Sequence, residues 1–226
     1  MGTEQPGFGY QPALDGVRAV AVAMVLVFHL DLGFHTGGYL GVSVFFTLSG
    51  FLITSLLIRE RERTGSISFS GFYLRRVRRL LPASLACIAA VAVMASFGAF
   101  DRSGDLRPSL FGALFQVQNW VALGSDTSYA DLFAAPSPLD HFWSLAIEEQ
   151  FYWLWPLAVA GIATLLVRRG RPGAFVGPML ALFALTAVSA PVTYALWGAD
   201  AAYFTSWARM AEILAGAALA ALLVGR

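Results

Sequence analysis

The sequence predicts an all-α fold, a polytopic bundle of transmembrane helices with about six spans plus a re-entrant or short seventh segment. Hydrophobic residues make up 58% of the 226 residues, and charged residues only 13%. A soluble domain carries roughly twice that share of charge. The apolar residues are also gathered into stretches close to the ~20 residues that a helix needs to cross a bilayer. These observations indicate a multi-span helical membrane protein with a single domain over residues 1–226.

The apolar stretches define the expected elements in order. They lie at 13–33, 38–58, 82–100, 108–124, 141–167, 176–197 and 205–224. We expect 108–124 to be re-entrant or interfacial, because it is short and contains Gln116, Gln118 and Asn119. Arginine-rich loops stay in the cytoplasm. We therefore expect the short tail at 1–12 and the segments 59–81 and 168–175 to be cytoplasmic, in a multi-pass protein of the inner (plasma) membrane.

The first apolar stretch carries three ionisable residues, Asp15, Arg18 and His29. Each such group in a span costs about 3 kcal/mol, so by default it marks a functional site. Arg18 and His29 are eleven residues apart, about three helical turns, and share a helix face. An Asp15–Arg18 pair with a purely structural role is an equally good interpretation. His29 is the stronger candidate, since imidazole suits proton transfer near neutral pH.

An arginine cluster, FYLRRVRRLLP at 72–82, directly precedes the third stretch. Its charge is explained by membrane orientation or by contact with anionic lipid. Arginine forks also bind phosphates with two hydrogen bonds. The cluster could therefore hold the phosphates of a nucleotide-bearing donor.

The segment HFWSLAIEEQFYWLWP at 141–156 places two adjacent glutamates about two turns inside a span. His141 and Glu148 are seven residues apart and align on one face, with Glu149 and Tyr152 on the adjoining side. The alternative is a charge effect of the helix N-terminus, which fades within one turn. We therefore favour a functional role for the glutamates.

Two further groups of polar residues lie inside apolar stretches. Arg209 and Glu212, three residues apart, can pair directly, and a structural ion pair is at least as good an interpretation as a functional one. Ser43, Thr47 and Ser49 place hydroxyls in the second stretch, which alone indicates only packing and local hydrogen bonds.

Taken in order, these segments resemble the integral-membrane O-acyltransferases of acyltransferase family 3. The matching pieces are LDGVRAVAVAMVLVFH, GGYLGVSVFFTLSGFLIT, FYLRRVRRLLP, QNW, SPLDHFWSLAIEEQFYWLWPL and YFTSWARMAEILAGAALA. The resemblance implies that Arg18 and His29 form the signature of the first helix. It places the cytoplasmic R-x-x-R of the family on Arg76 and Arg79. Its H-x-W-S-x-x-x-E-E run falls on His141, Trp143, Ser144, Glu148 and Glu149.

The resemblance implies transfer of an acyl group, most simply acetyl, from cytoplasmic acyl-CoA to a hydroxyl of a cell-envelope glycan or another acceptor. The expected partners are acyl-CoA as co-substrate, membrane lipids, and an envelope polysaccharide such as lipopolysaccharide or peptidoglycan, or a small hydroxylated acceptor. No permanently bound cofactor, metal or nucleic acid is expected. A non-catalytic component of polysaccharide export or transport, or an inactive truncated relative, are the alternatives.

Two departures from the family pattern matter. Ser43 stands where relatives usually have an aspartate, so a carboxylate is missing from the second helix. The family domain has about ten helices, so this chain resembles its N-terminal part. The candidate site residues are therefore His29, Arg18, Glu148, Glu149 and His141 for catalysis and Arg76 and Arg79 for the donor. Asp15, Ser43, Trp143, Ser144, Arg209 and Glu212 are further candidates.

Overall fold

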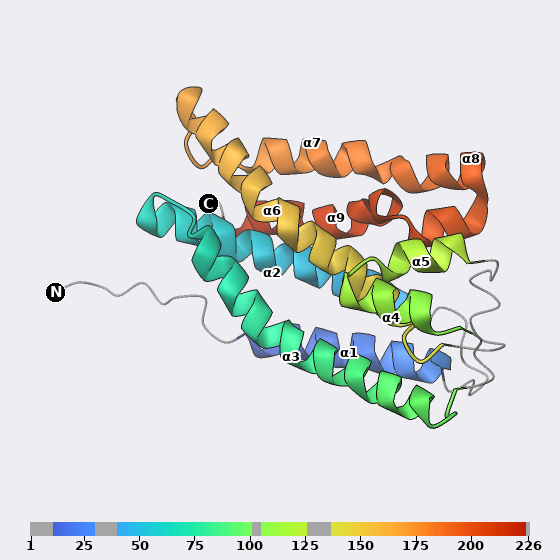
Figure 1. The fold of residues 1–226 in the computed structure, drawn as a ribbon. Coiled ribbons are helices and arrows are strands. Elements are labelled where there is room, and N and C mark those ends of the chain that lie inside the picture. The colour runs from blue at the N-terminus through green and yellow to red at the C-terminus, as the bar shows by residue number, and fades with distance from the viewer. Residues whose placement is uncertain (1–10, 30–39, 101–104, 126–136, 225–226) are drawn as a thin grey trace.

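The structure is a computed structural model that describes residues 11–29, 40–100, 105–125 and 137–224; of His29 only the backbone is described. These residues form nine helices and no strand (Figure 1). The helices are α1 (Pro12–His29), α2 (Leu40–Thr64), α3 (Phe69–Ser96), α4 (Arg107–Leu114), α5 (Gln118–Gly124), α6 (Phe142–Arg168), α7 (Val176–Ala187), α8 (Ser189–Phe204) and α9 (Ser206–Val224).

Five helical segments among the described residues are long and apolar enough to cross a membrane. They are α2, α3, α6, the consecutive pair α7–α8, and α9. The predicted all-α polytopic bundle is therefore confirmed. The stretch predicted at 176–197 is extended to Phe204 and divided into α7 and α8, and Gly198 in α8 has a left-handed φ of 88°.

Two glycines bring α2 and α9 together at the centre of the bundle. A Cβ atom on Gly50 would overlap the backbone carbonyl of Ile213, and one on Gly216 would overlap that of Thr47. Small residues allow two helix backbones to approach this closely in membranes. Gly41 does the same for α2 against α1, where a Cβ would lie 2.7 Å from the Ala21 carbonyl oxygen. These contacts join α1, α2 and α9 in a row, and α7–α8 packs on the other side of α9 (Figure 1).

The segment expected to be re-entrant or short forms two helices, α4 and α5, with a sharp turn between them. Gln116 in this turn has a left-handed φ of 58°. At 1.5 Å per residue neither helix could cross a bilayer. A buried amide network fixes the pair: Gln150 of α6 donates to the Gln116 carbonyl oxygen at 2.9 Å and to Oδ1 of Asn119 at 3.0 Å. Asn119 in turn donates to the carbonyl oxygen of Phe204 at 3.0 Å.

The arginine cluster lies on a helix, which corrects the expected position of the third span. The apolar stretch begins at 82, but α3 begins at Phe69 and continues through Pro82 without interruption. The helix starts there because the Ser68 side chain accepts a hydrogen bond from the Gly71 N–H. Only residues 65–68 separate α2 from α3, so most of the segment 59–81 is helical. The α2–α3 and α6–α7 turns lie at the same end of the bundle (Figure 1).

Candidate functional site

The first polar cluster lies where α6 packs against α2. The Tyr152 hydroxyl donates a hydrogen bond to Oε2 of Glu148 at 3.0 Å, and the Ser49 hydroxyl of α2 also bonds this carboxylate. Nearby, the Trp155 indole N–H donates to the Thr54 hydroxyl at 2.8 Å. Buried polar groups in a membrane protein need such internal partners. The two helices therefore hold the Glu148 carboxylate in a fixed position inside the bundle.

Arg76 reaches this cluster from α3. Its guanidinium carbon lies 3.8 Å from the centre of the Tyr152 ring and 5.9 Å from that of Phe72. Its positive charge acts on the carboxylates of both Glu148 and Glu149. Arg79, one turn further along α3, is exposed. The two arginines of the R-x-x-R pair thus have different surroundings, with Arg76 turned inward and Arg79 on the surface.

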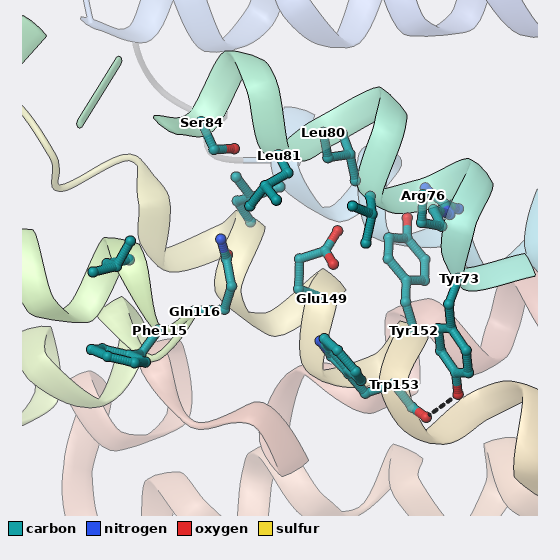
Figure 2. A pocket seen from close by; sticks show the side chains of 13 residues that line it. Tyr73, Arg76, Leu80, Leu81, Ser84, Phe115, Gln116, Glu149, Tyr152 and Trp153 are labelled. Atoms are coloured by element: carbon teal, nitrogen blue, oxygen red, sulfur yellow. Dashed lines mark hydrogen bonds between the residues drawn. The ribbon is translucent and has the colours of Figure 1, made fainter. Parts of the chain in front are cut away.

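A cavity of about 320 Å³ lies beside the cluster, between α3, α6 and the α4–α5 turn (Figure 2). Tyr73 closes one side, because its hydroxyl donates to the Trp153 carbonyl oxygen at 2.7 Å and its ring stacks on the Trp153 indole. The lining residues are Tyr73, Arg76, Val77, Leu80, Leu81, Ser84, Leu114, Phe115, Gln116, Leu145, Glu149, Tyr152 and Trp153. The cavity is thus largely apolar, with a few charged or polar side chains.

A second polar cluster joins α2 to α9. Arg209 and Glu212 form an ion pair with 3.1 Å between Nη2 and Oε2. The Ser43 hydroxyl donates to Oε1 of Glu212 at 3.0 Å, and the Thr47 hydroxyl donates to the Glu212 carbonyl oxygen. The Arg209 guanidinium also lies within 6 Å of three ring centres, those of Phe46, Trp143 and Tyr203. Ser43 is therefore a direct partner of the ion pair.

The polar residues of α1 form a local pair. Nη1 of Arg18 lies 3.1 Å from Oδ1 of Asp15, and both side chains are partly exposed. His29 is the last residue of α1, and its side chain lies outside the described part of the structure. The predicted grouping of Arg18 with His29 therefore stays a prediction.

The residues around the start of α6 do not join the glutamate cluster. His141 is exposed and precedes the helix, and its carbonyl oxygen accepts a hydrogen bond from the Ser144 hydroxyl. Trp143 is buried against Phe204 and Tyr203, on the side of the second cluster. Burial raises the pKa of the Asp140 carboxyl, and the Ser137 N–H that donates to it at 2.7 Å partly offsets this rise. Trp143 and Glu148 thus have separate surroundings, and His141 lies at the surface before the helix begins.

The structure adds three residues to the predicted site, Tyr152, Ser49 and Gln116. Tyr152 lines the cavity together with Glu149, as predicted, and its hydroxyl also bonds Glu148. The spacing of four residues could have indicated this pair. Ser49 and Gln116 also contribute, but only the packing of α2 and α4–α5 against α6 brings them close to the glutamates. Within the described ranges, no three His, Cys, Asp or Glu side chains gather to hold a metal ion.

The fold and the charged interior define a class, a polytopic helical membrane protein with a partly buried arginine–glutamate site beside a cavity. The profile of acyltransferase family 3, described as an acyltransferase domain, matches residues 11–225. The chain belongs to this family of acyltransferases, as its sequence motifs indicate.

Named relatives support this membership. The peptidoglycan O-acetyltransferase OatA of Listeria monocytogenes is 38% identical over 213 residues, which are 93% of this chain and 34% of that protein. YrhL of Bacillus subtilis, provisionally named a peptidoglycan O-acetyltransferase, is 39% identical over 214 residues, which are 93% of this chain and 33% of that protein. The chain spans about a third of the length of these curated relatives. No solved structure matches the chain significantly.

Proposed function

We propose that this chain is the membrane-embedded catalytic part of an O-acetyltransferase that uses cytoplasmic acetyl-CoA and modifies a hydroxyl of an envelope glycan, most simply peptidoglycan. The observation that carries the proposal is the partly buried Arg76–Glu148–Glu149 group beside the cavity, in a chain of this acyltransferase family. Ionisable groups inside a membrane protein are costly, which is a physical reason to assign them a function. The names of OatA and YrhL support the glycan acceptor.

The proposed donor site lies at the arginine-rich end of α3. Arg75, Arg78 and Arg79 are exposed there, and their guanidinium groups can form paired hydrogen bonds with phosphate oxygens. Arg79 takes the leading role among the predicted phosphate ligands. Arg76, whose guanidinium lies over the Tyr152 ring, serves mainly as the positive partner of the glutamates.

The proposed reaction is the transfer of an acetyl group from sulfur to oxygen. The acceptor oxygen attacks the thioester carbonyl carbon, the C–S bond breaks, and the hydroxyl proton moves to a base. His29 is the proposed base, or the residue that carries the acetyl group briefly before the acceptor takes it. Arg18 is the proposed partner of His29, and His141 lies at the end of α6 where an acceptor could approach. The departing thiolate then takes up a proton.

The test is transfer of radiolabelled acetyl from acetyl-CoA in membranes that contain this chain. We expect label in protein or in an envelope glycan, and its loss in His29→Ala and Arg79→Ala. Arg171→Ala is the matched control, because this exposed arginine lies in the α6–α7 turn and neither belongs to α3 nor lines the cavity. Label that is equal in all variants, or absent from the unsubstituted chain, would contradict the proposal.

A short pulse separates the two roles proposed for His29. Rapid quenching before acceptor is added should trap label on the protein if His29 carries the acetyl group. Direct transfer predicts no such protein label, although the product still forms at its usual rate.

A further inference from the structure

The cavity between α3, α6 and the α4–α5 turn contains acceptor oxygens that the described residues leave unsatisfied. No described group donates a hydrogen bond to Oε1 of Glu149 or to Oε1 of Gln116, although both atoms are buried. Both residues line the cavity, and Figure 2 shows both side chains directed toward α3. An unmatched buried acceptor costs about 1–3 kcal/mol, and more when it is charged. This pair therefore indicates that the cavity receives hydrogen-bond donors from a ligand.

The rest of the lining narrows the chemistry of that ligand. Most of the wall is apolar, because Val77, Leu80 and Leu81 of α3 line the cavity together with Leu114, Phe115 and Leu145. The Ser84 hydroxyl and the Gln116 amide can each donate as well as accept a hydrogen bond. A ligand with both N–H and C=O groups on an apolar chain would satisfy these side chains. Amide groups on a methylene chain have this chemistry.

The size and the charge of the site also favour a narrow, amide-bearing chain as the ligand. A volume of about 320 Å³ is at the lower limit for ligand pockets, so it fits one slender arm better than a bulky molecule. Arg76 lies at one end of the cavity, and the exposed Arg75, Arg78 and Arg79 lie on the same helix. A suitable ligand therefore has anionic groups at one end and a narrow amide-bearing chain beyond them.

We infer that this cavity binds the pantetheine arm of the acyl-CoA donor, with Glu149 accepting an amide N–H and Gln116 and Ser84 bonding the amide groups along the arm. The inference rests on the proposed function, because it takes acyl-CoA as the donor. It assigns Glu149 to donor binding and leaves Glu148, which is held by Tyr152 and Ser49, to the interior of the site. The anionic end of the donor then lies toward the arginines of α3.

The test is a binding titration of the full chain in lipid nanodiscs with three probes: CoA, pantetheine, and adenosine 3′,5′-bisphosphate. Leu81→Trp fills the cavity, and Leu85→Trp is the matched control, since Leu85 is equally exposed on α3 but does not line the cavity. We expect Leu81→Trp to weaken pantetheine and CoA by about tenfold or more. Binding of the bisphosphate should be unchanged, and Leu85→Trp should leave all three affinities unchanged.

A second variant, Glu149→Leu, tests the hydrogen bond. It removes a carboxylate whose buried Oε1 has no hydrogen-bond donor, and Glu148 still balances the charge of Arg76, so the fold should keep its thermal stability while pantetheine binding falls by about tenfold. CoA binding that is unaffected by both variants would overturn the cavity assignment and leave the proposed function standing. Absence of CoA binding to the unsubstituted chain would overturn both. A chitooligosaccharide serves as a fourth probe. If the two variants lose its binding while their pantetheine binding is unaffected, the cavity belongs to the acceptor and the inference is overturned.

Discussion

At the scale of single residues, the site depends on an unequal charge balance. One guanidinium, that of Arg76, acts on two carboxylates, Glu148 and Glu149, and it also lies over the Tyr152 ring that bonds Glu148. In a low-dielectric interior, removal of one charged partner leaves the others uncompensated. Arg76 should therefore matter for stability as well as for activity, whereas its exposed neighbours on α3 should have little effect on stability.

The first prediction follows from this balance. Arg76→Gln should lower the free energy of unfolding by about 1–2 kcal/mol. The loss is smaller than for a fully buried ion pair, because Arg76 is only partly buried and solvent screens its charge. Thermal unfolding in detergent, followed by tryptophan fluorescence, measures the change. Arg78→Gln is the control, since Arg78 is exposed on the same helix. Addition of Glu149→Gln to Arg76→Gln should restore part of the loss. A double variant no more stable than Arg76→Gln alone would contradict the charge-balance account.

At the scale of helices, close backbone contact and a buried amide network hold the elements together. The α2–α9 contact requires glycine at positions 50 and 216, and the α4–α5 pair is tied to α6 and α9 through Gln150, Asn119 and Ser206. The glycine contact between α2 and α9 leaves no room for a side chain at either glycine. The amide network requires particular side chains, because only they supply the donors and acceptors. Both should therefore respond strongly to single substitutions.

The second prediction concerns the helix contact. Gly50→Ala should destabilise the bundle by roughly 1–3 kcal/mol or more, because its Cβ would overlap the backbone of Ile213. Gly161→Ala in α6 is the matched control, since a Cβ there meets no atom within 4 Å. Unfolding temperatures in one detergent compare the two variants. Equal stability of Gly50→Ala and Gly161→Ala would show that α2 and α9 are further apart than described.

The third prediction concerns the amide network. Gln150→Leu removes the donor to the Gln116 carbonyl oxygen and to Asn119, so hydrogen exchange in α4 and α5 should become faster. Thr164→Val is the control, because the Thr164 hydroxyl bonds only its own helix at Ala160 among the described contacts. Exchange rates measured by mass spectrometry should change in α4 and α5 and not in α2. Unchanged protection of α4 and α5 would mean that apolar packing alone holds them.

At the scale of the whole molecule, the arginine-rich turns gather at one end of the bundle. The α2–α3 and α6–α7 turns lie at this end, and the α5 region lies toward the other (Figure 1). Basic segments remain in the cytoplasm during insertion. The proposed donor site on α3 is therefore expected to be reached from the cytoplasm.

The fourth prediction tests this orientation with a membrane-impermeant maleimide. In a Cys87→Ser background, which removes the single cysteine, Ser66→Cys and Ala174→Cys should react only after cells are permeabilised. Gly124→Cys at the end of α5 should react in intact cells, and a Cβ at this position meets no atom within 4 Å. Reaction of Ser66→Cys from outside would reverse the topology and contradict a cytoplasmic donor site.

The sequence predicted the fold class and most spans, because long apolar stretches in water-free surroundings leave few alternatives to helices. It also indicated the short segment around Gln116, since polar residues interrupt that stretch. It did not predict the start of α3, because a charged amphipathic segment is as compatible with a loop as with a helix. Nor did it predict that Ser43 would bond Glu212, a contact between α2 and α9 that depends on tertiary packing. The pairing of Tyr152 with Glu148 was within reach of the sequence, and the position of Gln116 beside Glu149 was not.

The glycine contact between α2 and α9 has a consequence for biosynthesis. Gly50 emerges from the ribosome early, whereas Gly216 belongs to the final helix described. At about 5–20 residues per second, α2 waits roughly ten to thirty seconds for its main partner. During that interval its small-residue face and its Ser43 and Thr47 hydroxyls lack their α9 contacts. Insertion chaperones and membrane proteases would meet the chain in this half-assembled state, so its cellular abundance should depend on translation speed more than that of bundles closed by neighbouring helices.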